Sequence, residues 1–120
     1  MNKKITVLNV CDNTLHIKKL NELVYMYSCG RKTKAVCCKG NEYLIKRCLS
    51  DIAKKLPKEN FFKIHNSFII NVAYIKRISM RERIVILFND NDQIILQIAH
   101  RRLKEFLDFI YMRFNILESG

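Results

Sequence analysis

Most of this chain alternates apolar and polar residues with a period of two, and this pattern limits its fold more than any other feature. Successive side chains of a β-strand point to opposite faces, so the alternation indicates strands with one buried face. Strands are predicted over residues 4–10, 15–17, 23–27, 34–38, 43–46, 61–65, 68–75, 83–88 and 93–99. Polar turn signals separate them, including the run 89–92. We therefore expect a mostly β domain with antiparallel sheets.

Two segments have helical spacing instead. Apolar residues recur at i, i+3, i+4 and i+7 in residues 49–56, and Pro57 ends that segment. Residues 101–115 place Leu103, Phe106 and Ile110 on one helical face. We expect a short helix near 49–56 and a C-terminal helix near 101–115 packed on the sheet. The strand–helix–strand alternation of Rossmann and P-loop folds is absent from the sequence.

Length and charge indicate one domain with a polyanionic partner. A chain of 120 residues can bury a core as a single domain, 1–120, without a metal or disulfide. The net charge is +11, which costs self-repulsion unless an anionic partner offsets it. Basic residues cluster at Arg31-Lys32-Thr33-Lys34 and at His100-Arg101-Arg102. A site built from separated loops is therefore expected, although the charge could also serve solubility alone.

The cysteines and the hydropathy favour a soluble cytoplasmic protein. The five cysteines are odd in number and lack the spacing of metal ligands, as in reduced intracellular proteins. The N-terminus has no signal-peptide pattern, and no apolar run is long enough for a membrane span. We expect no disulfide, no bound metal and no membrane insertion.

Catalysis is not expected. Glycine-rich phosphate-binding motifs are absent, and His16, His65 and His100 are far apart without a nearby nucleophile motif. The acidic residues of the run 89–92 indicate a turn rather than a cation site. We expect no catalytic residue and no cofactor.

The run FFKIHNSFIINVAYIKRI, residues 61–78, holds polar residues between two apolar segments. Asn66 can both donate to and accept from adenine, and Ser67 can donate to a phosphate. His65 could be a half-buried hydrogen-bonding group or an exposed one. Asn71 is expected to be a structural residue at a bend. Asn66 is thus the main candidate for a base contact.

This run resembles the signature of the LytTR family of bacterial DNA-binding domains. The pattern is Phe, any residue, Arg or Lys, any residue, His, a polar residue, Ser, an aromatic residue, and then two apolar residues and Asn. The matching residues are Lys63, His65, Asn66, Ser67, Phe68 and Asn71. Segments 21–28, 42–62 and 83–107 resemble other parts of the family, so the likeness covers essentially the whole chain.

The resemblance implies an elongated domain of stacked antiparallel sheets that contacts DNA through loops around 31–34, 63–67 and 99–102. Base contacts carried over from the family are Lys32, Asn66, His100 and Arg101. Phosphate contacts are expected from Arg31, Thr33, Lys34, Lys63, Ser67 and Arg102. The expected partner is double-stranded DNA with paired direct repeats, bound by two copies side by side that are monomers in solution.

The chain departs from the family in two respects that bear on its function, and Cys48 also stands where a Ser or Thr cap is usual. Ala99-His100 stands where the family usually has Ser-Arg, and a neutral His cannot make the bidentate guanine contact of Arg. Either Arg101 takes over this contact, or the preferred base differs. The sequence also encodes no receiver domain, so we expect a stand-alone regulator or an excised domain, and a separate regulatory partner protein is compatible with either.

Three classes of function remain open from the sequence. The first is a sequence-specific bacterial transcription regulator. The second is a module that binds RNA or DNA without sequence preference, and the third is a protein-interaction domain that no longer binds DNA. Loss of specificity on substitution of Asn66 would distinguish the first from the second.

Overall fold

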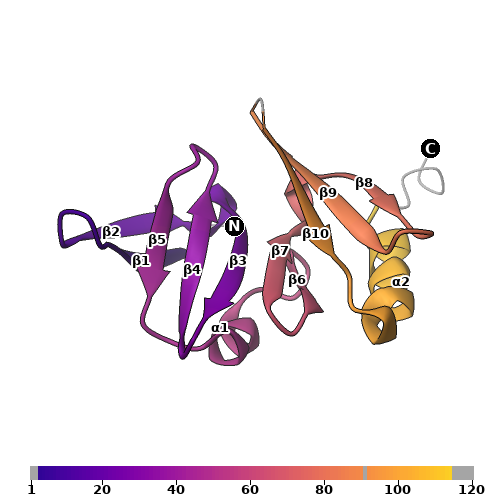
Figure 1. Cartoon of the computed structure of the whole chain (residues 1–120), viewed down its shortest axis with the longest axis horizontal. Helices are drawn as coiled ribbons and strands as arrows, with labels where there is room; N and C mark the ends of the chain where they lie inside the picture. Colours follow the sequence, from indigo (N-terminus) through magenta and orange to yellow (C-terminus); the bar gives the residue numbers. More distant parts are fainter. Residues whose placement is uncertain (1–2, 91, 115–120) are drawn as a thin grey trace.

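The computed structural model describes residues 3–90 and 92–114, which form an elongated molecule of 46 × 30 × 29 Å. Two antiparallel sheets lie side by side along its long axis (Figure 1). The larger sheet has the strand order β2-β1-β5-β4-β3-β7-β6, and the smaller has the order β10-β9-β8. The prediction of a mostly β fold with stacked antiparallel sheets is confirmed.

The larger sheet is built from hairpins that are consecutive in the chain. Its strands are β1 (Lys4–Asn9), β2 (Thr14–Lys19), β3 (Leu23–Cys29), β4 (Lys32–Cys37), β5 (Glu42–Ile45), β6 (Phe61–His65) and β7 (Phe68–Asn71). The smaller sheet consists of β8 (Ile75–Ser79), β9 (Ile84–Asn89) and β10 (Asp92–Gln97). Every strand pair in both sheets is antiparallel.

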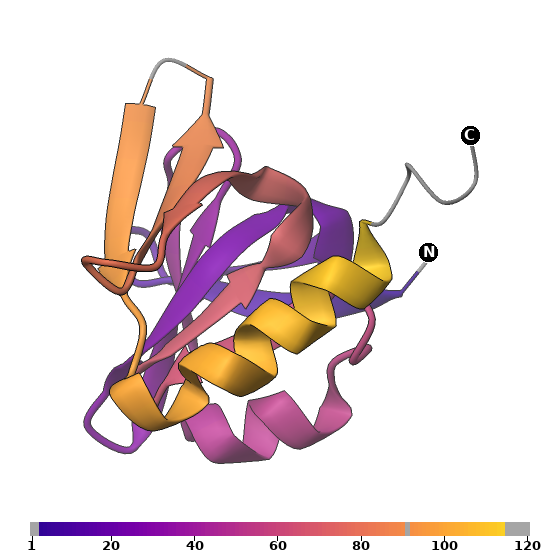
Figure 2. The ribbon, with the colours of Figure 1, turned by 90° about the vertical axis from the view of Figure 1, so that its right-hand side faces the viewer.

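Two α-helices and short 3₁₀ turns join and cover these sheets. The helices are α1 (Leu49–Lys55) and α2 (Leu103–Arg113), and the 3₁₀ turns are η1 (Leu20–Glu22), η2 (Val72–Tyr74) and η3 (His100–Arg102). Figure 2 shows α2 lying across the end of the molecule with α1 beneath it. The C-terminal helix was predicted near 101–115, but η3 occupies its expected first residues, and residue 115 lies outside the described residues.

The core has two parts, one for each region of the fold. Ile52 and Leu56 pack with Leu23 and Met26 beneath the larger sheet. The second part contains Val24, Ile64, Ile70, Val85, Leu87, Leu96, Ile98 and Phe106. Because strands β3, β6 and β7 of the larger sheet contribute to this second part, it joins the two sheets. Phe106, which is fully buried, fixes α2 against it.

The predicted continuous strand 68–75 is wrong beyond Asn71. The chain leaves the larger sheet at Asn71, forms η2, and enters the smaller sheet as β8. The Asn71 side chain is buried, its Nδ2 donates to the Leu23 carbonyl at 2.8 Å, and its Oδ1 accepts from the Ala73 amide at 3.0 Å. The expectation that Asn71 is a structural residue at a bend is confirmed.

Replacing Asn71 with Ala should destabilise the domain by about 1–3 kcal/mol, because the buried Leu23 carbonyl and the Ala73 amide would each lose a partner. Urea unfolding followed by circular dichroism measures this loss. Asn21→Ala is the matched control, since the Asn21 side chain is exposed and should change the unfolding free energy little. Equal stability of the two variants would contradict a structural role for the Asn71 amide.

Candidate nucleic-acid interface

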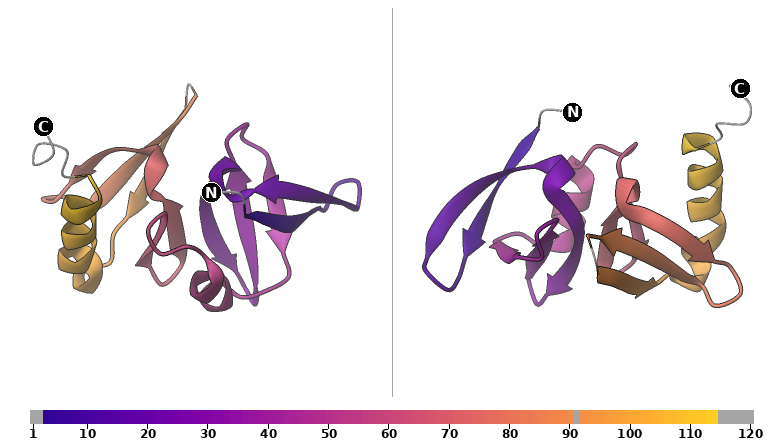
Figure 3. Two further views of the ribbon diagram at one scale, coloured as in Figure 1. Left: turned by 180° about the vertical axis from the view of Figure 1, so that it is seen from behind. Right: turned by 90° about the horizontal axis from the view of Figure 1, so that it is seen from above.

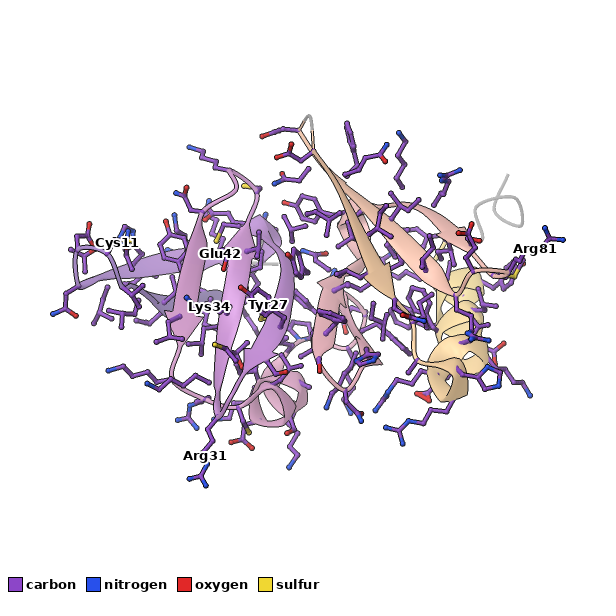
Figure 4. The ribbon with its side chains drawn as sticks, in the orientation of Figure 1. Cys11, Tyr27, Arg31, Lys34, Glu42 and Arg81 are labelled. Atoms are coloured by element: carbon purple, nitrogen blue, oxygen red, sulfur yellow. The ribbon has the colours of Figure 1, made fainter. Side chains whose placement is uncertain are left out.

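The first predicted loop is a tight hairpin turn between β3 and β4. Cys29 pairs with Lys32 across the strands, which leaves only Gly30 and Arg31 between them, so the turn is narrower than the loop predicted around 31–34. Gly30 has φ of 64°, the left-handed conformation that glycine adopts without strain in such turns. Arg31 and Lys32 are exposed, and Figure 4 shows the Arg31 side chain extending outward from the hairpin tip.

Thr33 and Lys34 belong to strand β4 rather than to a loop. The Thr33 side chain is fully buried, and its hydroxyl donates to the Arg47 carbonyl at 2.8 Å. This hydroxyl is therefore not available to a phosphate, which argues against the predicted contact and gives Thr33 a structural role. The period-two pattern could not show this, because it does not tell which face of β4 is covered by another segment.

Lys34 is half-buried on the strand face where it pairs with Tyr27. The Tyr27 hydroxyl donates to Glu42 Oε1 at 2.7 Å, and this bond to a carboxylate raises the pKa of Tyr27 to about 12 because it favours the neutral phenol. Figure 4 shows Lys34 on the same face as Tyr27 and Glu42. Lys34 therefore lies along the sheet, set back from the hairpin tip.

The second predicted loop is the turn between β6 and β7. His65 is half-buried and pairs with Phe68 across the turn, which leaves Asn66 and Ser67 at the tip. The Ser67 amide donates to His65 Nδ1 at 3.1 Å, and the rings of His65 and Phe68 lie 5.4 Å apart. The role of His65, left open by the sequence, is thus that of a half-buried group which closes the turn and leaves Asn66 exposed.

The third predicted loop packs directly against the second. After β10 the Ala99 amide donates to the Ile64 carbonyl at 2.9 Å, which fixes the start of η3 beside β6. Arg101 Nη2 then donates to Asn66 Oδ1 at 2.7 Å. Both side chains are exposed. Two residues that were predicted separately as base contacts therefore form one hydrogen-bonded pair, and this pair lies at the surface.

His100 is exposed and lies beside Arg83, a residue that no sequence pattern indicates. Arg83 Nη1 is 3.4 Å from His100 Nδ1, and Arg83 is half-buried with φ of 55° in the turn before β9. The Arg83 carbonyl also accepts from the Ile98 amide at 2.8 Å. Because Arg83 is remote in sequence from His100 and precedes an ordinary apolar strand, no sequence signal pointed to it.

Lys63 and Arg102 are brought together in a cleft between α1, β6 and α2. The cleft has a volume of about 310 Å³ and also includes Lys58 and Glu105. Arg102 is half-buried, and its Nε atom is buried without a hydrogen-bond partner in the described part of the chain. These two predicted phosphate contacts therefore line one cleft, with Lys63 on β6 and Arg102 in η3.

The three loops form a continuous edge of the molecule. The Ser28 amide of β3 donates to the Ser67 carbonyl at 3.0 Å, and the bonds from Ala99 and Arg101 join the second loop to the third. In Figure 1 the β3–β4 turn, the β6–β7 turn and the segment before α2 all lie along the lower edge. We call this surface the loop edge; its exposed members are Arg31, Lys32, Asn66, His100 and Arg101.

The loop edge carries several cations and hydrogen-bond donors, with one amide at its centre. Such a surface suits a nucleic acid, which combines a polyanionic backbone with hydrogen-bond acceptors on the edges of its bases. Within residues 3–90 and 92–114, His, Cys, Asp and Glu side chains form no group suited to hold a metal ion. In the same ranges, neither helix is long and apolar enough to cross a membrane.

Comparison with known proteins identifies the fold and the family. The sequence model of the family described as the LytTr DNA-binding domain matches residues 13–110 of this chain. A solved LytTr DNA-binding domain of a putative methyl-accepting/DNA response regulator from Bacillus cereus superposes with a TM-score of 0.74 at 21% identity, covering 92% of this chain and 98% of that one. This structural likeness shows the fold.

A sequence relative is the transcriptional regulatory protein NatR of Bacillus subtilis (strain 168). It is 34% identical over 65 residues, which are 54% of this chain and 28% of NatR. The chain thus matches little more than a quarter of the length of that relative. The family match, which covers most of the chain, implies a domain for DNA binding in transcription regulation. The chain belongs to the LytTR family of DNA-binding domains.

Proposed function

We propose that the chain is a sequence-specific bacterial transcription regulator that contacts major-groove bases through the loop edge. The observation that carries this proposal is the hydrogen bond between Arg101 and Asn66, because it orients two base-contacting side chains before DNA arrives. Side chains held in this way lose less conformational entropy when they bind.

The Asn66–Arg101 pair also suggests which residue replaces the guanine contact that the family makes with Arg at the position of His100. Asn66 Oδ1 has two lone pairs, so it can accept from Arg101 and from adenine N6 together while Nδ2 donates to adenine N7. The remaining donors of Arg101 can contact a neighbouring guanine, which is the contact that a neutral His100 cannot make. We propose that Arg101 takes over this contact and that His100, beside Arg83, lies at its flank.

The other members of the interface have separate roles in this proposal. Lys32 contacts a base from the first loop, and Arg31 contacts phosphate from the hairpin tip. Lys34, Lys63, Ser67 and Arg102 contact the DNA backbone from positions around the loop edge. Thr33 is not included, because its hydroxyl is buried and bonded to Arg47.

We further propose that the operator consists of paired direct repeats on one face of double-stranded DNA. Two copies that are monomers in solution would bind them side by side, with half-sites separated by whole helical turns. The protein would act in the cytoplasm, where the genome is, and a separate regulatory partner protein could control it.

Substitutions on the loop edge should separate base contacts from phosphate contacts. Asn66→Ala and Lys32→Ala should each weaken operator binding by about 1–3 kcal/mol and relax the preference at one base position. Arg31→Ala should weaken all sequences alike and reduce the salt dependence of binding. Selection of bound sequences from a random DNA pool, followed by fluorescence anisotropy at several salt concentrations, measures both effects.

The same experiment tests the second candidate function, a nucleic-acid module without sequence preference, which the net charge of +11 favours. Recovery of a motif by the unmodified domain supports the regulator. An unchanged ratio of specific to non-specific affinity in Asn66→Ala would overturn the base-contacting role of the second loop.

The Arg101–Asn66 bond should appear as a coupling energy in operator binding. Arg101→Ala and Asn66→Ala remove the same oriented pair, so the double variant should lose less affinity than the two single losses added together, by about 0.5–3 kcal/mol. Lys32→Ala combined with Asn66→Ala is the control, because Lys32 lies on another hairpin. Strict additivity for Arg101 and Asn66 would show that the bond does not contribute to DNA recognition.

DNA should protect Cys29 from alkylation while Cys11 stays reactive. Both thiols are exposed, but Cys29 pairs with Lys32 on the loop edge, and Cys11 lies at the far tip of the β1–β2 hairpin (Figure 4). Burial raises the pKa of the Cys37 thiol to about 11, so it should react little in the folded protein. Brief labelling with iodoacetamide and mass spectrometry measures each site; equal protection of Cys11 and Cys29 would argue against docking through the loop edge.

A further inference from the structure

A groove separate from the loop edge lies between the start of β1, the end of β5 and α1. Its volume is about 430 Å³, within the usual size range of small-molecule sites. Figure 3 shows these elements from behind, with the N-terminal end of β1 and α1 on that side of the molecule. None of the residues predicted or proposed to contact DNA lines this groove.

The floor of the groove is apolar. It is formed by Ile5, Leu20, Ile45, Ile52 and Leu56. Of these, Ile52 and Leu56 come from α1 and its C-terminal boundary, while Ile45 is the last residue of β5. The groove therefore opens directly onto the core beneath the larger sheet, where an apolar ligand group would be removed from water.

The rim of the groove is cationic. The charged residues among those that line it are Lys3, Lys4, Lys46, Arg47 and Lys55, and all of them are basic. Each of these side chains is exposed, and long cationic side chains can rest their aliphatic stems on apolar surface while the charged group stays in water. These cations come from three separate chain segments and surround one opening. The solvated face of a single helix would instead draw its cations from one segment.

We propose that this groove binds a small amphipathic anion, with its carboxylate, phosphate or sulfonate group among the rim cations and its apolar body on the floor. An inorganic anion would leave the floor exposed to water, and an apolar cation would be repelled by the rim. The DNA backbone carries a charged phosphate at every nucleotide and has no extended apolar group to cover the floor. The combination of floor and rim thus selects one chemical class.

Some residues that line the groove also support the β3–β4 turn, the first of the three predicted DNA-contacting loops. Ile45 pairs with Thr33 across the strands, and the Arg47 carbonyl accepts the Thr33 hydroxyl at 2.8 Å. Thr33 follows Lys32 directly in β4. An anion bound in the groove would therefore contact residues that hold the base of the β3–β4 hairpin, although no residue that lines the groove is a proposed DNA contact.

Decanoate is a suitable probe, because it joins a carboxylate to an apolar chain of about the size of the groove. Titration of the ¹⁵N-labelled full chain, without DNA and below the aggregation concentration of decanoate, should shift the amide signals of Ile5, Ile45 and Ile52. Acetate and decyltrimethylammonium, which keep only the charge or only the chain, should bind at least about tenfold more weakly.

A charge-matched pair of variants locates the site. Lys4→Glu with Lys55→Glu should weaken decanoate binding by about tenfold or more, since two rim cations are replaced by anions. Lys39→Glu with Lys76→Glu makes the same change in net charge at exposed positions that line neither this groove nor the Lys63–Arg102 cleft, and should leave the affinity unchanged. Circular dichroism checks that both variants are folded.

Three results would overturn the proposal. Equal weakening by both pairs of variants would indicate a non-specific charge effect. Equal binding of acetate or decyltrimethylammonium would show that the combination of rim and floor is not selective. Signal shifts confined to the Lys63–Arg102 cleft would place the ligand elsewhere. Because no DNA is present, none of these results depends on the proposed regulator function.

Discussion

The two hydrogen bonds of the buried Asn71 side-chain amide fix the bend between the two sheets, and the arrangement of the sheets depends on this bend. One bond ties the end of β7 to Leu23, and the other starts η2, which directs the chain out of the larger sheet. The smaller sheet then packs its apolar face on β6 and β7 through the shared core. This packing brings the segment after β10 to the β6–β7 turn, so the loop edge follows from a bend that a buried side chain, Asn71, fixes.

The loop edge is ordered mainly by its backbone. Bonds from the Ser28 and Ala99 amides fix the neighbours of the second loop, and the His65 ring closes that loop from within. Each bond contributes little net stability alone, but together they limit the conformations of three turns that would otherwise move independently. The exposed side chains are therefore attached to an ordered backbone, as recognition through loops requires.

The sequence predicted the fold class, both helices and most strands, because one buried face per strand leaves a clear period of two. It failed at residues 68–75, where Ile70 and Ile75 belong to different sheets yet continue one apolar run. It also placed Thr33 with the basic loop, since its burial depends on Arg47 in another segment. The Arg101–Asn66 and Arg83–His100 contacts were beyond prediction from one sequence, because each joins residues that only the sheet arrangement brings together.

The bond between Arg101 and Asn66 has an evolutionary consequence. A substitution at either residue removes the hydrogen bond between them, so under the proposed function a new operator preference would require changes at both. Among homologues, the residues at these two positions should therefore vary together, and lineages that acquire a new operator should replace them as a unit. The two loops would then behave in evolution as one inherited element, although they are distant in the chain.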